Sequence, residues 1–206
     1  MPFRFEEKIN ISGSNAFLFK SWVIDSGGTK IHNDRTVTSV YFDNSALDLY
    51  TLSNEGSVPR KKIRLRCYDE LNKIGEFTRF EIKISSAEGR YKEISIIENS
   101  NSILKYGILD KEYGICKPVV LISYVRSYYK LFELRITIDQ NIKYRKYNKN
   151  LYKTSYAKER NIIAEIKSDN INYASDIKNN CPFNFTRFSK YCRAIEHLFT
   201  NKVIRV

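Results

Sequence analysis

The feature that most constrains the fold of this chain is a strict alternation of charged and apolar residues, which returns in about eight segments. The clearest case is Lys62–Tyr68, where every second residue is apolar and the alternate positions are Lys62, Arg64 and Arg66. Because successive side chains of a β-strand point to opposite faces, each such segment predicts a strand with one apolar and one charged face. Like charges about 7 Å apart along one face repel each other, so this face meets either water or an anion.

The same reasoning places the other elements along the chain. Strands are expected at Phe3–Ile11, Arg35–Asp43, Glu76–Ser85, Arg90–Ile97, Val119–Tyr129, Phe132–Tyr144 and Ile162–Ser168. Helices are expected at Ala16–Ile24, Ala46–Leu52 and Asn99–Glu112, and in two pieces after Ile171 that break at Cys181-Pro182. Lys143–Lys158 reads as a polar connection rich in Tyr and Lys. No repeat or linker divides the sequence, so we expect one domain over residues 1–206.

The composition favours an anionic partner. Lys and Arg number 35 against 23 Asp and Glu, a formal net charge of +12, while 42% of the residues are hydrophobic, as in a globular chain. The N-terminus lacks the apolar core of a signal peptide and no run is long enough to span a bilayer, so we expect a cytoplasmic protein. The four cysteines have no zinc spacing and are expected to be reduced thiols, and the two histidines are too far apart in sequence to suggest a metal cage.

The alternation by itself leaves two arrangements open. In the first, the charged faces are solvated or form a nucleic-acid surface, on which Tyr144, Tyr147, Tyr152 and Tyr156 among lysines would stack bases. In the second, helices cover the apolar faces and the charged faces line a closed barrel, whose interior at about eight strands holds a small ligand. The apolar stripes of the predicted helices need a partner surface, which supports the barrel, but the pattern alone still gives more weight to the solvated or nucleic-acid surface.

An ordered set of short motifs resembles a known family. The matching stretches are Arg4–Lys8, Ser39–Asp43, Arg60–Tyr68, Phe80–Lys83, Ser123–Arg126, Leu134–Asp139, Ala164–Lys167 and Phe188–Tyr191. Together they resemble the VTC domain, the polyphosphate polymerase branch of the CYTH or triphosphate tunnel metalloenzyme superfamily. The resemblance implies an α+β fold: an eight-stranded antiparallel β-barrel, the triphosphate tunnel, with helices packed outside and a C-terminal helix.

The resemblance also implies roles for individual residues. The catalytic cations would be Lys8, Arg64, Arg66, Arg126 and Arg135. The phosphate or substrate contacts would be Lys83, Lys92, Tyr124, Lys167, Ser189 and Lys190. Glu165 would bind a divalent metal ion, Mn²⁺ or Mg²⁺, or would serve only as an ion-pair partner. Glu6, Glu81 and Asp139 are expected to be structural counter-ions of the cations.

The implied function is a metal-dependent transfer of the terminal phosphate of ATP to a growing polyphosphate chain. Phosphoryl transfer needs charge neutralisation and positioning more than a protein nucleophile, and a phosphate acceptor is already ionised, which suits a site without histidine. A hydrolase of the same fold that cuts triphosphate or polyphosphate, and a non-catalytic binder of polyphosphate or nucleotides, remain alternatives.

One departure from the superfamily pattern bears on this choice. Many hydrolases and cyclases of the superfamily begin with Glu-x-Glu-x-Lys, whereas this chain has Arg4-x-Glu6-x-Lys8. The exchange of a carboxylate for a cation favours the polymerase branch. The expected partners are ATP and inorganic triphosphate or polyphosphate, and nucleic acid is not expected. Without a phosphate-sensing helical domain or a membrane span, product translocation would need a separate membrane protein partner.

Overall fold

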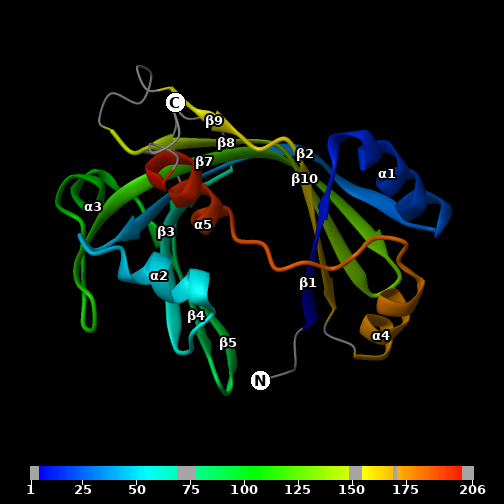
Figure 1. Cartoon of the computed structure of the whole chain (residues 1–206), viewed down its shortest axis with the longest axis horizontal. Coiled ribbons are helices and arrows are strands. Elements are labelled where there is room, and N and C mark those ends of the chain that lie inside the picture. The colour runs from blue at the N-terminus through cyan, green and yellow to red at the C-terminus, as the bar shows by residue number, and fades with distance from the viewer. Residues whose placement is uncertain (1–4, 69–77, 149–154, 169–170, 201–206) are drawn as a thin grey trace. The chain divides into compact units, whose positions relative to one another are not determined.

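The computed structural model describes residues 5–68, 78–148, 155–168 and 171–200 (Figure 1). The strands are β1 (Phe5–Ile11), β2 (Thr29–Asp43), β3 (Arg60–Cys67), β4 (Thr78–Ser86), β5 (Gly89–Ile97), β6 (Ile108–Asp110), β7 (Gly114–Leu131), β8 (Leu134–Lys146), β9 (Ala157–Lys158) and β10 (Ile162–Ser168). The α-helices are α1 (Ala16–Asp25), α2 (Asp48–Glu55), α3 (Asn101–Tyr106), α4 (Ile171–Asn180) and α5 (Lys190–Ile195). The predicted start of a strand at Glu76, and Arg4, lie outside the described residues.

The strands follow one hydrogen-bonded path in the order β1-β10-β8-β7-β2-β3-β4-β5, with β6 beside β7 and β9 beside β8. The β1–β10, β10–β8, β2–β3, β3–β4 and β4–β5 pairs are antiparallel. The chain divides into two compact units. Unit 1 comprises Met1–Arg35, Tyr124–Ile142 and Lys158–Phe188, and unit 2 comprises Thr36–Ser123, Lys143–Ala157 and Ser189–Val206. The single domain expected from the sequence stays a prediction.

The core of unit 1 lies between α1, α4 and the apolar faces of β1, β7, β8 and β10. Alternate residues of β1, β8 and β10 supply it, among them Ile9, Ile136 and Ile166, all at most 1% exposed. Phe19 and Val23, four residues apart on α1, pack against them. The period-two and helical patterns read from the sequence therefore point into one shared core.

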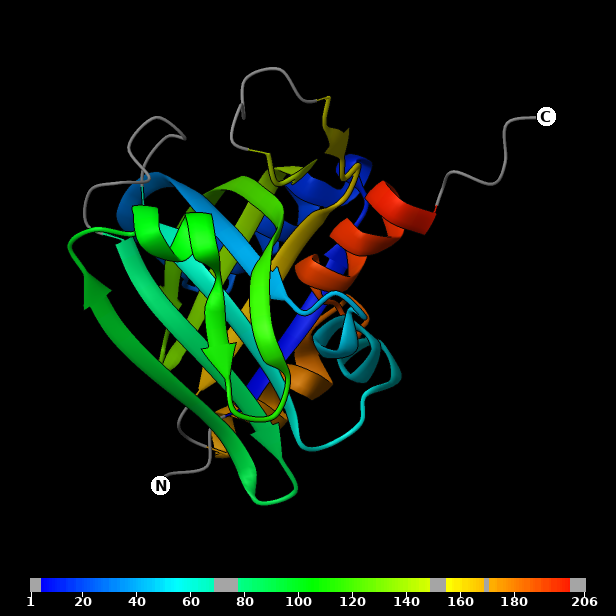
Figure 2. The ribbon, with the colours of Figure 1, turned by 90° about the vertical axis from the view of Figure 1, so that its left-hand side faces the viewer.

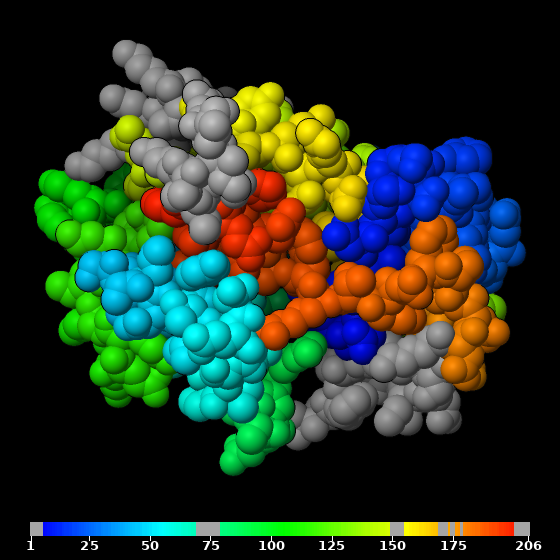
Figure 3. All heavy atoms as spheres, viewed as in Figure 1, coloured from blue at the N-terminus to red at the C-terminus, as the bar shows by residue number. Residues whose placement is uncertain are grey.

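The core of unit 2 is built in the same way on β2 and β3. Val40 and Phe42 alternate with polar residues on β2, Ile63 and Leu65 do so on β3, and Leu49 of α2 covers them. Figure 2 shows the meander of β3, β4 and β5 that continues from this core. On the face seen in Figure 3, α5 lies beside α2.

The charged faces of these strands are buried as well. In unit 2, Arg64 is 8% exposed, Arg66 is 6% exposed and Glu81 is fully buried, and in unit 1 Asp139 is fully buried and Glu165 is 8% exposed. A solvated sheet would expose these side chains, so that arrangement is wrong at these positions. Buried charges of this kind need oppositely charged or hydrogen-bonding partners.

The helix predicted at Asn99–Glu112 is wrong beyond its first half. α3 ends at Tyr106 and the chain continues as β6, which pairs with β7. Gly107, with φ of 89°, forces this change, since a left-handed residue ends a helix. The spacing of apolar residues within one segment could not predict that Ile108–Asp110 pairs with the later segment Gly114–Cys116.

Two other predicted boundaries need correction. The break at Cys181-Pro182 is a longer non-helical segment, in which Phe185 forms an isolated bridge with Ile9, before α5 begins at Lys190. The polar connection at Lys143–Lys158 is wrong at its start, because β8 continues to Lys146 and Tyr144 is buried. Tyr144 stacks on His197, with ring centroids 5.6 Å apart, and is part of the core of unit 2 rather than a surface for bases.

All four cysteines are free thiols, and Cys67, Cys116 and Cys192 are buried. Among the described residues, no helix is both long and apolar enough to cross a membrane.

Gly107 generates a prediction about stability. A Cβ at Gly107 would lie 2.5 Å from the carbonyl oxygen of Cys116, whereas one at Gly114, which also has positive φ, would meet nothing within 4 Å. We expect Gly114→Ala to lower the free energy of unfolding by about 1 kcal/mol through backbone strain. Gly107→Ala should lower it by about 2 kcal/mol more, because backbone has to move. Urea denaturation measures both, and equal losses would contradict the close approach of these strands.

Candidate functional site

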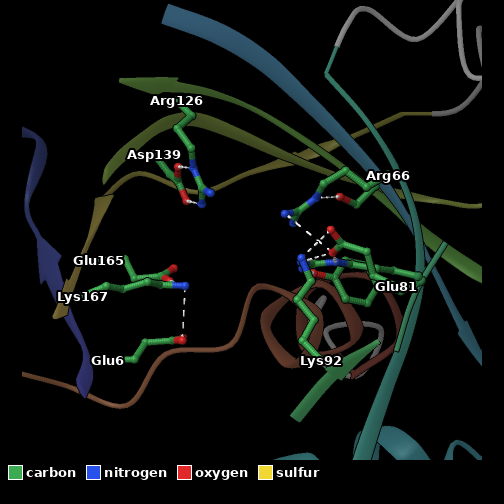
Figure 4. Close-up of polar contacts among 11 residues, drawn as sticks. Glu6, Arg66, Glu81, Lys92, Arg126, Asp139, Glu165 and Lys167 are labelled. Atoms are coloured by element: carbon green, nitrogen blue, oxygen red, sulfur yellow. Dashed lines mark hydrogen bonds and ion pairs between the residues drawn. The ribbon is translucent and has the colours of Figure 1, made fainter. Parts of the chain in front are cut away.

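One charged site of unit 2 is centred on Glu81, and we call Arg64, Arg66, Glu81 and Lys92 the Glu81 cluster. Figure 4 labels Arg66, Glu81 and Lys92 of this cluster. Arg64 Nε donates to Glu81 Oε2 at 2.6 Å, and its Nη2 lies 2.5 Å from the same oxygen. Lys92 Nζ lies 2.7 Å from Oε1, and Arg66 Nη1 lies 3.8 Å from Oε2. The strand register explains the meeting, since Arg64 on β3 stands directly opposite Glu81 on β4.

Three cations thus surround one carboxylate. Burial raises the pKa of Glu81, but the charges of Arg64, Arg66 and Lys92 outweigh it and lower the pKa to about 2. The pKa of Lys92 is itself lowered, because burial and repulsion from the two guanidinium groups outweigh the attraction of Glu81. Glu81 therefore stays ionised, and within the cluster three cations share its single negative charge.

A second row of residues on β2 orients the two arginines. Arg64 Nη1 donates to the hydroxyl of Tyr41 at 2.9 Å, and Arg66 Nε donates to Ser39 Oγ at 3.1 Å. Each acceptor stands opposite its arginine in the β2–β3 register. Ser39 and Tyr41 belong to the motif Ser39–Asp43, but sequence reasoning assigned them no role. The signal that was missed is their two-residue spacing, which matches that of Arg64 and Arg66.

Tyr41 reports the local field. Burial raises its pKa, yet the charges of Arg64, Arg66 and Lys190, with the hydrogen bond from Arg64, lower the pKa to about 8. A buried phenol with a lowered pKa indicates a strongly positive surrounding. Lys190, the first residue of α5, is half-buried and adds to this field from another part of the chain.

α5 is tied to β2 by aromatic and polar contacts. The ring of Tyr191 stacks on Tyr41, with centroids 5.1 Å apart, and its hydroxyl donates to Asp43 Oδ2 at 2.5 Å. Burial and the Asp43 carboxylate raise the pKa of Tyr191. Asp43 also accepts backbone N–H groups at the start of α2, from Leu49 and Tyr50. Asp43 and Tyr191 were likewise not assigned from the sequence.

The other predicted residues of unit 2 lie close to this region. Lys83 on β4 stands opposite both Lys62 on β3 and Lys92 on β5. Ser189 is the N-cap of α5, where its Oγ accepts from the backbone N–H of Cys192 at 3.3 Å and from Lys62 Nζ at 3.0 Å. Unit 2 thus brings together Arg64, Arg66, Lys83, Lys92, Ser189 and Lys190.

In unit 1, Arg126 and Asp139 form a two-pronged ion pair (Figure 4). Arg126 Nε lies 2.6 Å from Oδ1 and Nη2 lies 2.7 Å from Oδ2. Burial lowers the pKa of Arg126, but Tyr124, Asp139 and Glu165 raise it above its ordinary value, so the guanidinium stays charged. The guanidinium carbon Cζ of Arg126 lies 5.2 Å from the centre of the Tyr124 ring, so the two predicted residues form a cation–π contact.

Lys167 joins two carboxylates of unit 1. Its Nζ lies 3.2 Å from Glu6 Oε2 and forms an ion pair with Glu165 (Figure 4). Lys8 stands opposite Glu165 in the β1–β10 register and donates through Nζ to the carbonyl of Phe188 at 2.8 Å. Arg135 stands opposite Lys167 and is exposed. Unit 1 therefore holds Lys8, Tyr124, Arg126, Arg135, Glu165 and Lys167.

The carboxylates of unit 1 fit a divalent cation in a limited way. Glu6 and Glu165 from adjacent strands converge on one ammonium group, a place where a small cation is electrostatically favoured. Carboxylate oxygens are the ligands that Mg²⁺ and Mn²⁺ prefer, and Mg²⁺ commonly keeps waters and substrate phosphates as its other ligands. Over the described ranges, no three His, Cys, Asp or Glu side chains gather as a complete protein cage.

Glu81 generates a prediction about acid stability. Its pKa is lower in the folded chain, about 2 against an ordinary value of 4.5, so the unfolded chain takes up the proton first as the pH falls. The stability that ionised Glu81 provides is complete above pH 4.5 and is lost between 4.5 and about 2, at most about 3 kcal/mol. Urea denaturation from pH 6 to pH 2.5 should therefore show a shallower loss of stability for Glu81→Gln than for the wild type.

Glu112→Gln is the matched control, because Glu112 is an exposed ion-pair partner of Lys61. It should keep the slope of the wild type. Parallel stability curves for wild type and Glu81→Gln would contradict the lowered pKa.

Comparison with known proteins places these clusters in a family. A family model described as the VTC domain matches residues 3–114 and 97–199. No curated protein sequence matches the chain.

Solved structures show the same fold at low sequence identity. A candidate adenylate cyclase from Vibrio parahaemolyticus has 14% identity and a TM-score of 0.54, over 94% of this chain and 98% of that one. A candidate adenylyl cyclase from Hippeastrum with a dominant triphosphatase activity has 14% identity and a TM-score of 0.54, over 95% and 96%. A chain of the Mediator head module of Schizosaccharomyces pombe has 9% identity and a TM-score of 0.53, over 87% and 96%.

At these identities the structures show the fold alone, and with the family match they confirm the predicted class, an α+β antiparallel fold of the triphosphate tunnel type. Because the family model covers the sequence almost from end to end, the chain belongs to the VTC domain family.

Proposed function

We propose that this chain is a metal-dependent polyphosphate polymerase, which transfers the terminal phosphate of ATP to a growing polyphosphate chain. The observation that carries the proposal is the Glu81 cluster, where Arg64, Arg66 and Lys92 share one buried carboxylate. Such a cluster of cations favours an anion, and a chain of phosphates supplies a dense line of negative charge. Membership of the VTC domain family supports the same substrate class.

The proposed chemistry needs no protein nucleophile. An ionised oxygen of the terminal phosphate of the polyphosphate attacks the γ-phosphorus of ATP, the bond from that phosphorus to the bridging oxygen breaks, and ADP leaves with the bonding electrons. The acceptor is already ionised at neutral pH, so a general base is not required. The task of the protein is to hold the phosphates in line and to neutralise charge in the transition state.

The geometry of unit 2 suits that task. Glu81 and Tyr41 hold Arg64 by three of its N–H groups, so its orientation is set before a phosphate binds. Ser39 orients Arg66 in the same way. A guanidinium held in one orientation presents its fork to phosphate oxygens with little further loss of entropy, whereas a lysine follows a moving chain as a point charge.

Residues of unit 1 have complementary roles in the proposal. Arg126 stays charged through its pairing with Asp139 and binds phosphate oxygens, together with Lys8 and Arg135. A divalent cation, Mn²⁺ or Mg²⁺, would supply Lewis-acid stabilisation of the phosphoryl oxygens, and Glu165 with Glu6 would hold it. Lys167, now paired with both carboxylates, would then turn to phosphate.

A hydrolase is the second candidate, favoured by the fold likeness to the Hippeastrum protein with triphosphatase activity. In that case water replaces the polyphosphate acceptor and the same cations stabilise the transition state. The cytoplasmic location and a separate membrane protein that exports the product belong to the polymerase proposal.

The test is incubation of the purified chain with ATP and Mn²⁺, followed by detection of both polyphosphate and free phosphate. We expect long-chain product, and a loss of at least about 100-fold in the variant Arg64→Ala with Arg66→Ala, because two cations that stabilise the transition state are removed. Free phosphate alone would establish the hydrolase instead. Neither product, with salt-sensitive retention of polyphosphate, would establish a non-catalytic binder.

Glu165 generates a prediction about metal dependence. Chelation with EDTA should abolish activity, and Glu165→Gln should weaken Mn²⁺ binding by at least about ten-fold, since a charged oxygen ligand becomes a neutral amide. Mn²⁺ binding is measured directly by electron paramagnetic resonance. Glu133→Gln, which changes an exposed carboxylate of the same unit, should bind Mn²⁺ like the wild type. Equal affinity in Glu165→Gln and Glu133→Gln would leave Glu165 only as a partner of Lys167.

A further inference from the structure

A row of lysines crosses the sheet of unit 2 beside the Glu81 cluster. Lys62 on β3 stands directly opposite Lys83 on β4, and Lys83 stands directly opposite Lys92 on β5. Residues directly opposite in antiparallel strands share a face, so the three ammonium groups extend the face of Arg64 and Arg66. Like charges in such pairs repel each other, so an anion lying along this face would relieve the repulsion.

The family resemblance assigns no role to Lys62, so its possible role has to be inferred from its surroundings. It is half-buried, and its Nζ lies 3.0 Å from Ser189 Oγ at the start of α5. Lys190 follows Ser189 in sequence, and its charge helps to lower the pKa of Tyr41. The ammonium of Lys62 therefore points into the same positive region that Arg64 and Lys190 create.

Lys61, the preceding residue on the same strand, lies on the other face of the sheet. Its Nζ lies 2.6 Å from Glu112 Oε2 and 3.3 Å from Asp110 Oδ1, and two carboxylates thus neutralise it. Burial lowers the pKa of Lys61, but these carboxylates raise it above its ordinary value. The two lysines carry the same charge and are neighbours on β3, but their side chains face opposite sides of the sheet.

We propose that Lys62 is a further phosphate-binding residue, which takes the phosphates of a long linear polyphosphate that lie beyond the reach of Arg64 and Arg66. The inference rests on the proposed function, since it concerns the same substrate. Successive same-face residues of a strand are about 7 Å apart, so Lys62 and Arg66 are separated by about 14 Å along β3. Pyrophosphate is too short to reach from Lys62 to Arg66, whereas a medium-length polyphosphate is long enough to contact Lys62, Arg64 and Arg66 together.

Lys62 therefore makes affinity depend on chain length. We expect Lys62→Gln to weaken the binding of medium-chain polyphosphate by about ten-fold, the effect of one charge-assisted hydrogen bond, and to leave pyrophosphate binding within about two-fold. Lys61→Gln removes the same charge from the other face and should change neither. Isothermal titration with both probes, at two salt concentrations, should also show a weaker salt dependence for Lys62→Gln alone.

The outcomes separate the inference from the proposed function. If wild-type protein binds neither probe, the proposed function fails. If it binds both and Lys62→Gln matches Lys61→Gln on the medium chain, only the role of Lys62 is overturned. Loss of pyrophosphate binding in Lys62→Gln would also overturn the dependence on chain length.

A substitution of Lys62 also removes its hydrogen bond to Ser189 and could change stability, so thermal stability needs its own control. Lys62→Gln and Lys62→Met are both melted with and without medium-chain polyphosphate, because a ligand that binds the folded state raises Tm whatever the starting stability. We expect a smaller Tm increase than in the wild type for both variants. A full wild-type increase in either variant would overturn the proposal.

Discussion

Charges that leave water have to be compensated on the sheet that buries them, and in this chain strand register provides the compensation. Glu81 lies opposite Arg64 because β3 and β4 pair in one particular register. A shift of that register by one residue would turn Glu81 to the other face and leave two buried arginines without their carboxylate. The register of β3 and β4 is therefore enforced by charge on one face as well as by the apolar core on the other.

Three cations share one carboxylate at Glu81, an arrangement that suits a binding face better than a purely structural one. Replacing a buried ion pair by apolar residues is often neutral or stabilising, so a protein selected for stability alone has little reason to gather three cations around one carboxylate. The lowered pKa of the buried phenol of Tyr41 reflects the local positive field. By contrast, Arg126 and Asp139 of unit 1 form a matched pair, in which the carboxylate mainly fixes orientation.

The fold by itself does not decide what this cluster of charge does, since related folds serve unrelated functions. The residues best suited to bind an anion are those whose orientation is fixed by hydrogen bonds within the protein. Arg64 is fixed by Glu81 and Tyr41, and Arg66 is oriented by Ser39. Oriented donors stabilise developing charge more effectively than mobile ones, because they need not reorganise during the reaction.

Local periodicity determined much of this protein from the sequence alone. A period of two residues predicted the strands and their charged faces, including Arg64 and Arg66, because side chains of a strand alternate whatever the strand pairs with. Helical spacing predicted α1 almost to the residue. The ordered motifs then indicated the family and named most of the cations that the two units bury.

Tertiary structure decided which of these residues meet, because pairing joins segments far apart in the sequence. Tyr41 and Ser39 acquire their roles only when β2 pairs with β3, and Lys62 reaches Ser189 only when α5 returns to that strand. The same limit explains the error beyond Tyr106, where strand pairing and the left-handed Gly107 override helical spacing. Periodicity is a property of one segment, whereas the burial and compensation of charge depend on which segments become neighbours.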